Sequence, residues 1–468
     1  MTKSTNNTIY RRRITQQESM FLHAPYAIVV LTARVKGLVS EDMLQNAVKK
    51  VQARHTNLRL KAEFDEGGDP WFTSRDVEAV PVEIIPREDD QGWMEVIQQQ
   101  RLIPFDFEVR PAIRFLLVQS DEVSELLIFC HHLICDGLSL AYLARDMMTV
   151  LGDPAINLEI LPDPKPVDRE NLPPGVKMNS LVNYFIERIN KKWRVQKVHF
   201  EQEDYQALTA AYWSNFNHEM ALLEFSEDQT AALVKKCKKE GVTVNSALAV
   251  GLAAAQIRVQ DSHPFHSKFT IAGSLRERLT KPPGEGMGIY AGAVNLSFAY
   301  KEKLGFWENV RKFNQKVQPL YTNKNLFKDP LVWNYLEPGI LESLSFKMIG
   351  GMVPPSSPRS EILNSFSRRE DVISSMIKRE KMDSFENVLI GTAVTNLTRL
   401  DFPRTFGELE LDRLIMNPGG AYPLTFVNLL AGAVTCSGKL SLLLEYVTER
   451  IEEETVSKIK DELMALLL

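Results

Sequence analysis

Cysteine is scarce in this chain, and its scarcity excludes one class of protein. The 468 residues contain four cysteines, none of which forms a CxxC pair. So few cysteines cannot hold a chain of this length together by disulfides, and sparse, unpaired cysteines are typical of a reducing compartment. Cys130 and Cys135 stand inside an apolar stretch, and we expect both to be small buried thiols. The other two are Cys237 and Cys436.

Long apolar segments and an excess of positive charge are also missing. No window of about 18–20 apolar residues exists, because the longest candidate, 126–143, is interrupted by two histidines and Asp136. Residues 1–13 are polar and then basic, with no apolar segment behind them to form the core of a signal peptide. The net charge of −5 lacks the basic excess of a nucleic-acid binder. We therefore expect no membrane span, no nucleic-acid partner and a cytoplasmic location.

Strand and helix patterns alternate along both halves of the chain, which predicts an α/β fold. An apolar, β-branched strand at 26–35 precedes a helix that Ser40 begins, and the apolar runs 112–119 and 126–130 form a predicted hairpin. In the second half we expect strands at 221–225, 269–272 and 440–447 and helices at 226–239, 247–259 and 452–467.

Six prolines between residues 152 and 174 mark the join between two halves, because proline interrupts regular elements. A single hydrophobic core stops growing at roughly 250–300 residues, so a chain of this length favours two lobes. We expect an N-terminal lobe at 1–175, a connector at 176–205 and a C-terminal lobe at 206–468.

The run His-His-Leu-Ile-Cys-Asp-Gly follows an apolar strand and precedes a helical pattern. Because side chains alternate along a strand, the rings of His131 and His132 point opposite ways, one into packing and one toward a cleft. Such a pair does not readily ligate one metal, and no further ligand stands at a suitable spacing, so we expect no metal site. On its own, Asp136 is explained as a helix N-cap and Gly137 as a turn residue with positive φ.

A histidine at the edge of a cleft brings a specific chemistry. Its ordinary pKa of about 6.5 lets it accept a proton from a hydroxyl or amine near neutral pH. A thiolate leaves readily, since the pKa of a thiol is about 8.5, and needs little acid assistance. One imidazole therefore suffices for acyl transfer from a thioester without a covalent intermediate, and no GxSxG nucleophile motif is present.

The run from His131 to Gly137 resembles the HHxxxDG signature of the condensation-domain and coenzyme A-dependent acyltransferase superfamily. The likeness is to stand-alone condensation or polyketide-associated enzymes, since the DFGWG motif of plant-type relatives is absent. Thr398 stands where the family usually has glycine. Further stretches that resemble family motifs, in the same order, are 54–59, 104–107, 110–114, 273–276 and 394–397.

This resemblance implies two lobes like chloramphenicol acetyltransferase, set as a V-shaped pseudo-dimer around a central tunnel that is entered from both faces. His132 is then the general base, and His131 supports the loop. Asp136 pairs structurally with Arg276, and the amide of Gly137 helps to hold the thioester or its oxyanion. We add Asn396 and Ser139 as expected residues of the substrate tunnel.

The sequence thus predicts a monomeric acyltransferase of secondary metabolism without a permanently bound cofactor. Its donor is a thioester on coenzyme A or on the phosphopantetheine arm of an acyl carrier protein, and its acceptor is a small alcohol or amine. A non-catalytic docking module of the same fold and a thioester hydrolase are the alternatives. The intact base argues against the first alternative, whereas residue types do not separate hydrolysis from transfer. The basic run 235–239 is either a surface that attracts phosphate or acidic groups or a solvated helix face.

Overall fold

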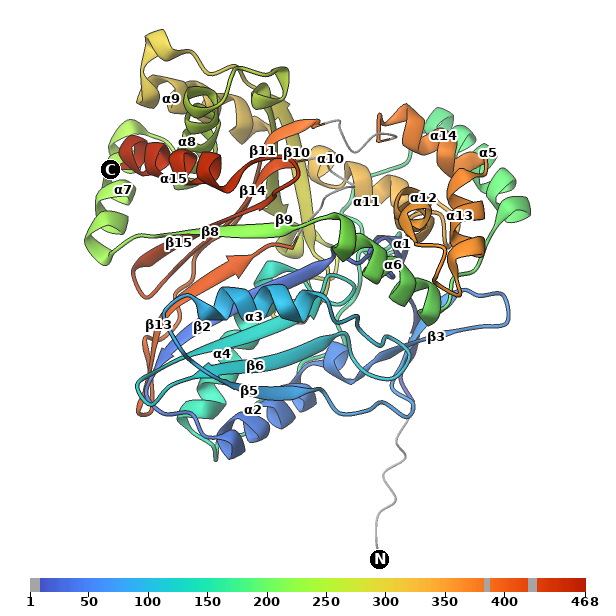
Figure 1. Ribbon diagram of the computed structural model, residues 1–468, viewed down its shortest axis with the longest axis horizontal. Helices are drawn as coiled ribbons and strands as arrows, with labels where there is room; N and C mark the ends of the chain where they lie inside the picture. Colours follow the sequence, from blue (N-terminus) through green and yellow to red (C-terminus); the bar gives the residue numbers. More distant parts are fainter. Residues whose placement is uncertain (1–8, 383–387, 420–426) are drawn as a thin grey trace, which may run out of the picture.

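Two six-stranded sheets, one above the other in Figure 1, form the frame of the molecule. The computed structural model describes residues 9–382, 388–419 and 427–468. The lower sheet has the order β12 (Thr405–Phe406), β13 (Leu409–Asn417), β2 (Ile28–Lys36), β7 (Val123–His131), β6 (Ile113–Gln119) and β5 (Val82–Pro86). The upper sheet has the order β10 (Ala291–Ser297), β9 (Lys268–Ser274), β11 (Ile390–Arg399), β14 (Val427–Cys436), β15 (Lys439–Val447) and β8 (His218–Glu224).

Helices cover each sheet, and several of them begin at or close to the residue that the sequence predicts. In the lower lobe α2 (Glu41–Arg54) packs against α4 (Gly137–Gly152), and Ser40 caps α2 by accepting a hydrogen bond from the Met43 amide. A third helix of this lobe is α3 (Gly92–Arg101). The upper lobe carries α7 (Glu227–Glu240), α8 (Val244–Val259), α9 (Phe306–Val317) and α15 (Glu453–Leu467). The α/β fold class is confirmed, and so is the hairpin β6–β7.

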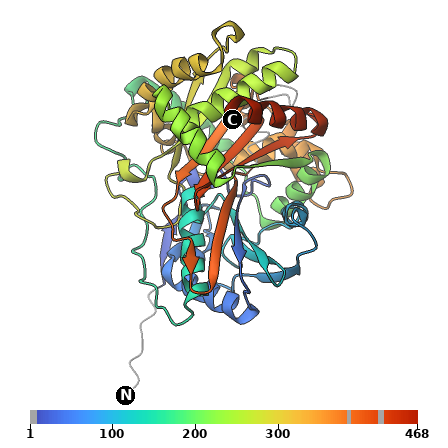
Figure 2. The same ribbon diagram turned by 90° about the vertical axis from the view of Figure 1, so that its left-hand side faces the viewer.

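The chain crosses between the lobes late in the sequence. Strand β13 pairs antiparallel with β2, with Leu414 opposite Ala33, so that a segment from the C-terminal half completes the N-terminal sheet. Figure 2 shows this orange strand running down among the blue and teal ones. It covers the edge of β2, whose backbone groups would otherwise lack partners. The predicted boundary at residue 206 assigns β13 to the C-terminal lobe, so it does not describe a C-terminal strand that lies in the N-terminal sheet.

A third layer of helices lies beside the two sheets (Figure 1), and apart from a basic, aromatic helix-like segment at 181–198 the sequence patterns do not predict it. These helices are too short for an apolar repeat to stand out, since several have fewer than ten residues. They surround a separate core that contains Trp193 and Phe346. The members are α5 (Ser180–Gln196), α6 (Gln202–Asn215), α11 (Lys328–Trp333), α12 (Glu342–Ile349), α13 (Ser360–Arg368) and α14 (Val372–Arg379). The short helix α10 (Asn323–Leu326) precedes α11 and buries Leu326 in the core of the upper sheet.

Smaller elements complete the described part of the chain. The short helix α1 (Gln16–Ser19) leads into β2, and a small sheet consists of β1 (Arg11–Arg13), β4 (Pro70–Thr73) and β3 (Lys61–Phe64). Cys130 and Cys135 are free and buried, as expected, and the other two cysteines are too. Within the described ranges, no single helix is long and apolar enough to cross a membrane, although α7 and α8, bent by 98°, meet that test as a pair.

Candidate active site

His131 is the last residue of β7, and its ring is fully buried. Nε2 donates to the carbonyl of Ala24 over 3.1 Å, while Nδ1 accepts from the Leu133 amide over 3.3 Å. Phe107 meets the ring edge-on, with 4.9 Å between centroids. Burial lowers the pKa of His131 to about 3, so this ring stays neutral and holds the start of the loop.

His132 is half-buried, and two contacts hold its ring in one orientation. Nδ1 lies 2.9 Å from the carbonyl oxygen of Cys135, and the ring of Phe21 stacks on it with 4.6 Å between centroids. A carbonyl oxygen only accepts, so Nδ1 carries the hydrogen and Nε2 carries the lone pair.

The electrostatics of His132 favour the same neutral form. Burial lowers the pKa of the ring, while the hydrogen bond to Cys135 and the charge of Asp136 oppose this effect without cancelling it. At neutral pH, Nε2 is therefore free to accept a proton.

Asp136 is fully satisfied in a buried network. Oδ1 accepts from the amide and the hydroxyl of Ser139, each over 2.7 Å, and from Nη2 of Arg276 over 2.8 Å. Oδ2 accepts from the amide of Tyr290 over 3.0 Å. Burial raises the pKa of this carboxyl, but the Arg276 charge and these hydrogen bonds together hold it below the usual range. Asp136 is thus an ionised helix cap as well as the expected partner of Arg276.

Arg276 ties the histidine loop to the other lobe. Its Nη1 donates to the carbonyls of Gly284 and Gly286, over 3.0 and 2.9 Å, while Nη2 reaches Asp136 and Ser139. The glycine-rich stretch after Arg276 therefore supplies backbone acceptors to the network. The sequence places four glycines at 284, 286, 288 and 292, a pattern typical of a turn-rich stretch, but it does not indicate that their carbonyls bind Arg276.

Ser139 does not line a substrate tunnel, and the expectation for this residue is corrected. Its side chain is completely buried, where Oγ bonds to Asp136 and to the carbonyl of Gly288 over 3.0 Å. Position N3 of α4 turns this hydroxyl back toward the cap, so the capping box takes it out of reach of a ligand.

Position 137 needs a glycine because neighbouring side chains leave no room for a Cβ, and not because of a turn. It is the first residue of α4, and its φ is not among the positive values. A Cβ here would lie 2.4 Å from Cε of Met416 and 2.8 Å from Cδ2 of Leu397. The glycine therefore lets β13 and β11 approach the start of α4, and the alternative of a positive-φ turn is wrong.

Asn396 and Thr398 form an unusual bend in β11. Thr398 has a φ of 62°, a left-handed conformation that a β-branched residue adopts only under strain. The side-chain oxygen of Asn396 accepts from the Thr398 amide over 2.7 Å, and the register of β11 with β14 shifts at this point. The left-handed φ is a physical reason for the glycine that the family usually has here.

A cavity of about 1310 Å³ opens between the lobes at the beginning of α4. Asp136, Gly137 and Asn396 line it, as do Tyr290 from the upper lobe and Lys235 from α7. His132 is not among its lining residues, so the cavity reaches the Asp136–Gly137 end of the motif and not the ring of the base. The tunnel open at both faces stays a prediction.

The basic run on α7 divides between two environments. Lys235 and Lys238 line the cavity together with Arg278, and no ion pair joins these three side chains to a carboxylate of the described residues. Lys236 instead pairs with Glu240, 3.2 Å away on the same helix. Part of the run therefore faces the cavity and part is a solvated helix face.

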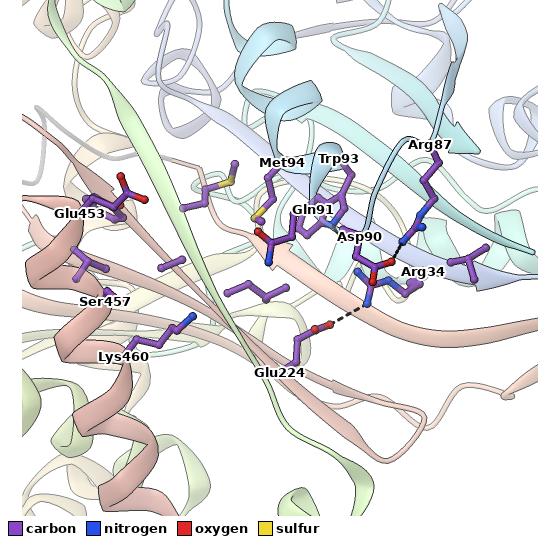
Figure 3. Close-up of a pocket in the computed structure, with 16 residues that line it drawn as sticks. Arg34, Arg87, Asp90, Gln91, Trp93, Met94, Glu224, Glu453, Ser457 and Lys460 are labelled. Atoms are coloured by element: carbon purple, nitrogen blue, oxygen red, sulfur yellow. Dashed lines mark hydrogen bonds and ion pairs between the residues drawn. The ribbon is translucent and has the colours of Figure 1, made fainter. Parts of the chain in front are cut away.

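A second cavity, of about 490 Å³, lies between α3, β8 and α15 (Figure 3). The arginines that line it are paired: Arg34 reaches Glu224 over 3.1 Å and Arg87 reaches Asp90 over 2.6 Å. Both arginines also bond to the buried Glu125. No residue of the histidine motif lines this cavity. The Arg34–Glu224 pair joins the two lobes, whereas the other pairs lie within the lower lobe. No group of three or more potential metal ligands occurs in the part of the chain that the structure describes.

Comparison of the sequence with known families and proteins identifies condensation domains as relatives. Residues 11–153 match the model of the condensation domain. The nonribosomal peptide synthetase agiA of Aspergillus flavus is 32% identical over 121 residues, which are 25% of this chain and 2% of that protein. The chain thus spans only a small fraction of the curated relatives that it matches.

Solved structures show the likeness of fold over the whole chain. Trichothecene 15-O-acetyltransferase TRI3 from Fusarium sporotrichioides has a TM-score of 0.63 at 12% identity, covering 100% of this chain and 97% of that one. Polyketide synthase associated protein 5 from Mycobacterium tuberculosis has a TM-score of 0.58 at 14% identity, covering 97% and 98%. Residues 11–153 thus match the condensation-domain family, and the whole chain shares the fold of these acetyltransferase and polyketide-synthase-associated structures.

Proposed function

We propose that this chain transfers an acyl group from a thioester to an alcohol or amine, with His132 as the general base. The observation that carries the proposal is the hydrogen bond from Nδ1 of His132 to the carbonyl of Cys135, 2.9 Å long. It leaves the lone pair on Nε2, the only atom of this ring that can take a proton from a nucleophile.

The reaction needs one proton carrier and no covalent enzyme intermediate. The acceptor hydroxyl or amine gives its proton to Nε2 as its oxygen or nitrogen attacks the thioester carbonyl. The tetrahedral intermediate then collapses, the carbon–sulfur bond breaks, and the departing sulfur takes the proton from the imidazolium. His132 is neutral again at the end, so one turnover leaves the enzyme unchanged.

The beginning of α4 suits the charge that develops on the carbonyl oxygen. The first amides of a helix have no partner within the helix and lie at its positive end. Gly137 occupies this position and lines the cavity, with no side chain in the way. We propose its amide as a donor to the oxyanion, a kind of contact that typically contributes about 10²–10³ in kcat.

We propose a coenzyme A thioester or the phosphopantetheine thioester of a carrier protein as donor. Lys235, Lys238 and Arg278 support this choice, because unpaired cations beside a cavity favour a ligand that carries phosphate. The small-molecule acceptor, a monomeric state and a cytoplasmic location stay predictions.

The test is release of free thiol from acyl-coenzyme A and from acyl-phosphopantetheine on a carrier protein, with and without a panel of alcohols and amines. Thiol release that requires the acceptor, with a new ester or amide in the mass spectrum, supports the proposal. Release at the same rate without acceptor identifies a hydrolase. No release from either donor with any acceptor overturns the proposal in favour of a docking module.

A further inference from the structure

The helix α5, between the two lobes in sequence, exposes apolar side chains to an unusual degree. Thirteen large apolar residues are exposed in the described part of the chain, and five of them are on this one helix. Leu181 is 65% exposed, Tyr184 58%, Phe185 52% and Val195 87%; the fifth is Val182. Exposed apolar residues scattered singly need no explanation, whereas a cluster indicates a surface that meets an apolar partner.

The inner face of α5 is already used within the chain. Ile186 and Trp193 are buried in the core of short helices, and the indole of Trp193 donates to the carbonyl of Pro338 over 2.9 Å. Asn190 donates to the carbonyl of Tyr335 over 2.8 Å. These residues, spaced by three and four, hold the helix at the edge of the molecule beside α14 (Figure 1). The opposite face is exposed, and part of it borders a shallow groove against the start of α14.

That outer face combines the apolar residues with positive charge. Arg188, Lys191 and Lys192 continue the stripe that Leu181, Tyr184 and Phe185 begin, at spacings of three, four and seven. All three cations are exposed, and none has an ion-pair partner among the described residues, whereas Arg194 on the flank pairs with Glu337.

Among the described residues, the acidic side chains near this stripe lie at its sides, and one of them, Asp371, is paired with Lys347 and Arg369. Glu187 lies on the flank and faces Arg194. Glu370, across a shallow groove from Tyr184 and Arg188, is paired with Lys378 over 2.8 Å. The stripe thus keeps its positive charge, although the whole chain has a net charge of −5. Any attraction of this protein to an anionic surface must come from such a local patch.

We propose that the outer face of α5 docks the protein on an anionic lipid bilayer. The stripe from Leu181 to Val195 is about 21 Å long, since a helix rises 1.5 Å per residue. An exposed helix with aromatic and aliphatic residues among arginine and lysine matches the chemistry of the headgroup boundary. The apolar side chains enter the boundary, while the long cationic side chains reach the lipid phosphates. An acidic protein surface would satisfy the cations but would leave the apolar side chains without an apolar partner.

Co-sedimentation with vesicles tests this docking face without reference to catalysis. The full chain is mixed with vesicles of phosphatidylcholine alone and with vesicles that also contain about 30% phosphatidylglycerol, because an anionic surface attracts each nearby lysine or arginine by about 1 kcal/mol. We expect binding to the anionic vesicles only, weakened by 0.5 M salt, since screening then acts over about 4 Å.

Two variants of α5 and one control assign the effect to this helix. Arg188→Gln/Lys191→Gln/Lys192→Gln is expected to weaken binding about 100-fold, and Tyr184→Ser/Phe185→Ser at least about tenfold. Lys301→Gln/Lys303→Gln/Lys324→Gln removes the same charge from exposed, unpaired lysines elsewhere and should bind as wild type does. Absence of wild-type binding, or equal loss in the control, overturns the proposal. A circular dichroism spectrum and melting temperature like those of wild type show that the variants fold.

Discussion

The two ends of the histidine motif lie a few residues apart and are held in opposite ways. Asp136 has four hydrogen bonds to two lobes and is buried, whereas His132 has one hydrogen bond, one stacked ring and partial exposure. A fully satisfied buried ion stabilises the structure and has no free capacity for chemistry. A ring with an unoccupied lone pair contributes little to stability and is available to react. The motif therefore separates the residue that holds the loop from the residue that reacts.

The largest expected effect is on turnover at the reactive end. His132→Ala should lower kcat/KM by about 10²–10⁴-fold, the contribution of a positioned base. The midpoint of thermal unfolding should move little, because the ring has few partners. Thiol release under single-turnover conditions measures the first quantity and calorimetry the second. A variant that unfolds well below wild type would assign His132 to structure instead.

The next effect is on stability at the other end of the motif. Asp136→Ala should cost about 3–5 kcal/mol, because it leaves the Arg276 guanidinium buried without a counter-charge. It should lower the rate as well, since the loop that carries His132 loses its anchor. Urea unfolding measures the free energy of unfolding. The comparison variant is Asp146→Asn, because Asp146 is another buried carboxylate of α4 in an ion pair. Equal stability and activity to wild type would contradict the orienting role.

The pH dependence of the reaction depends on both ends of the histidine motif, His132 and Asp136. Burial lowers the pKa of His132 below its ordinary 6.5, so the base form is present at neutral pH and is lost as the pH falls through that lowered pKa. The acid limb of kcat/KM should therefore lie below pH 6.5 and fall about tenfold per pH unit.

Asp136→Asn sharpens this comparison. The charge of Asp136 raises the pKa of His132, so its removal should move the acid limb to still lower pH. A limb that moves upward, or stays fixed in a folded variant, would show that Asp136 does not act on His132 electrostatically.

The smallest expected effect lies away from the motif, at the bend in β11. Thr398→Gly should stabilise the protein by about 1 kcal/mol, because glycine removes the strain of a left-handed β-branched residue and loses part of the gain to unfolded-chain entropy. Urea unfolding again measures the change, with Thr395→Gly in the same strand as a control that should destabilise. A destabilised Thr398→Gly protein would mean that the threonine makes contacts that outweigh its strain.

The elements that the sequence predicted well are those with long, clear patterns. Helix α2 begins after Ser40 and α7 after Ser226, each with the capping bond that the serine allows. The hairpin β6–β7 and the terminal helix α15 are also close to their expected ranges. The helices α10 to α14 were missed because each has nine residues or fewer, which is too short for an apolar repeat to stand out, and α12 is also buried on several sides.

The site shows the same division between local and long-range information. Residue spacing suggested one histidine facing a cleft, a cap at Asp136 and buried thiols beside them, while the choice of His132 as the base came from the family resemblance. It misassigned Ser139 and the reason for Gly137, because both depend on groups distant in sequence: the carbonyl of Gly288 and the side chain of Met416. Phe21, which stacks on His132, was missed for the same reason.

By itself, the sequence determined the α/β class, the boundaries of its longer elements and the order of the motif, since these depend on neighbours within a few residues. Only the tertiary structure decided that β13 closes the first sheet, that Arg276 reaches Asp136 from the other lobe, and that the described residues leave the outer face of α5 exposed. Such contacts join residues more than a hundred positions apart, and a local pattern of apolar and polar side chains does not specify which distant partner fills a given space.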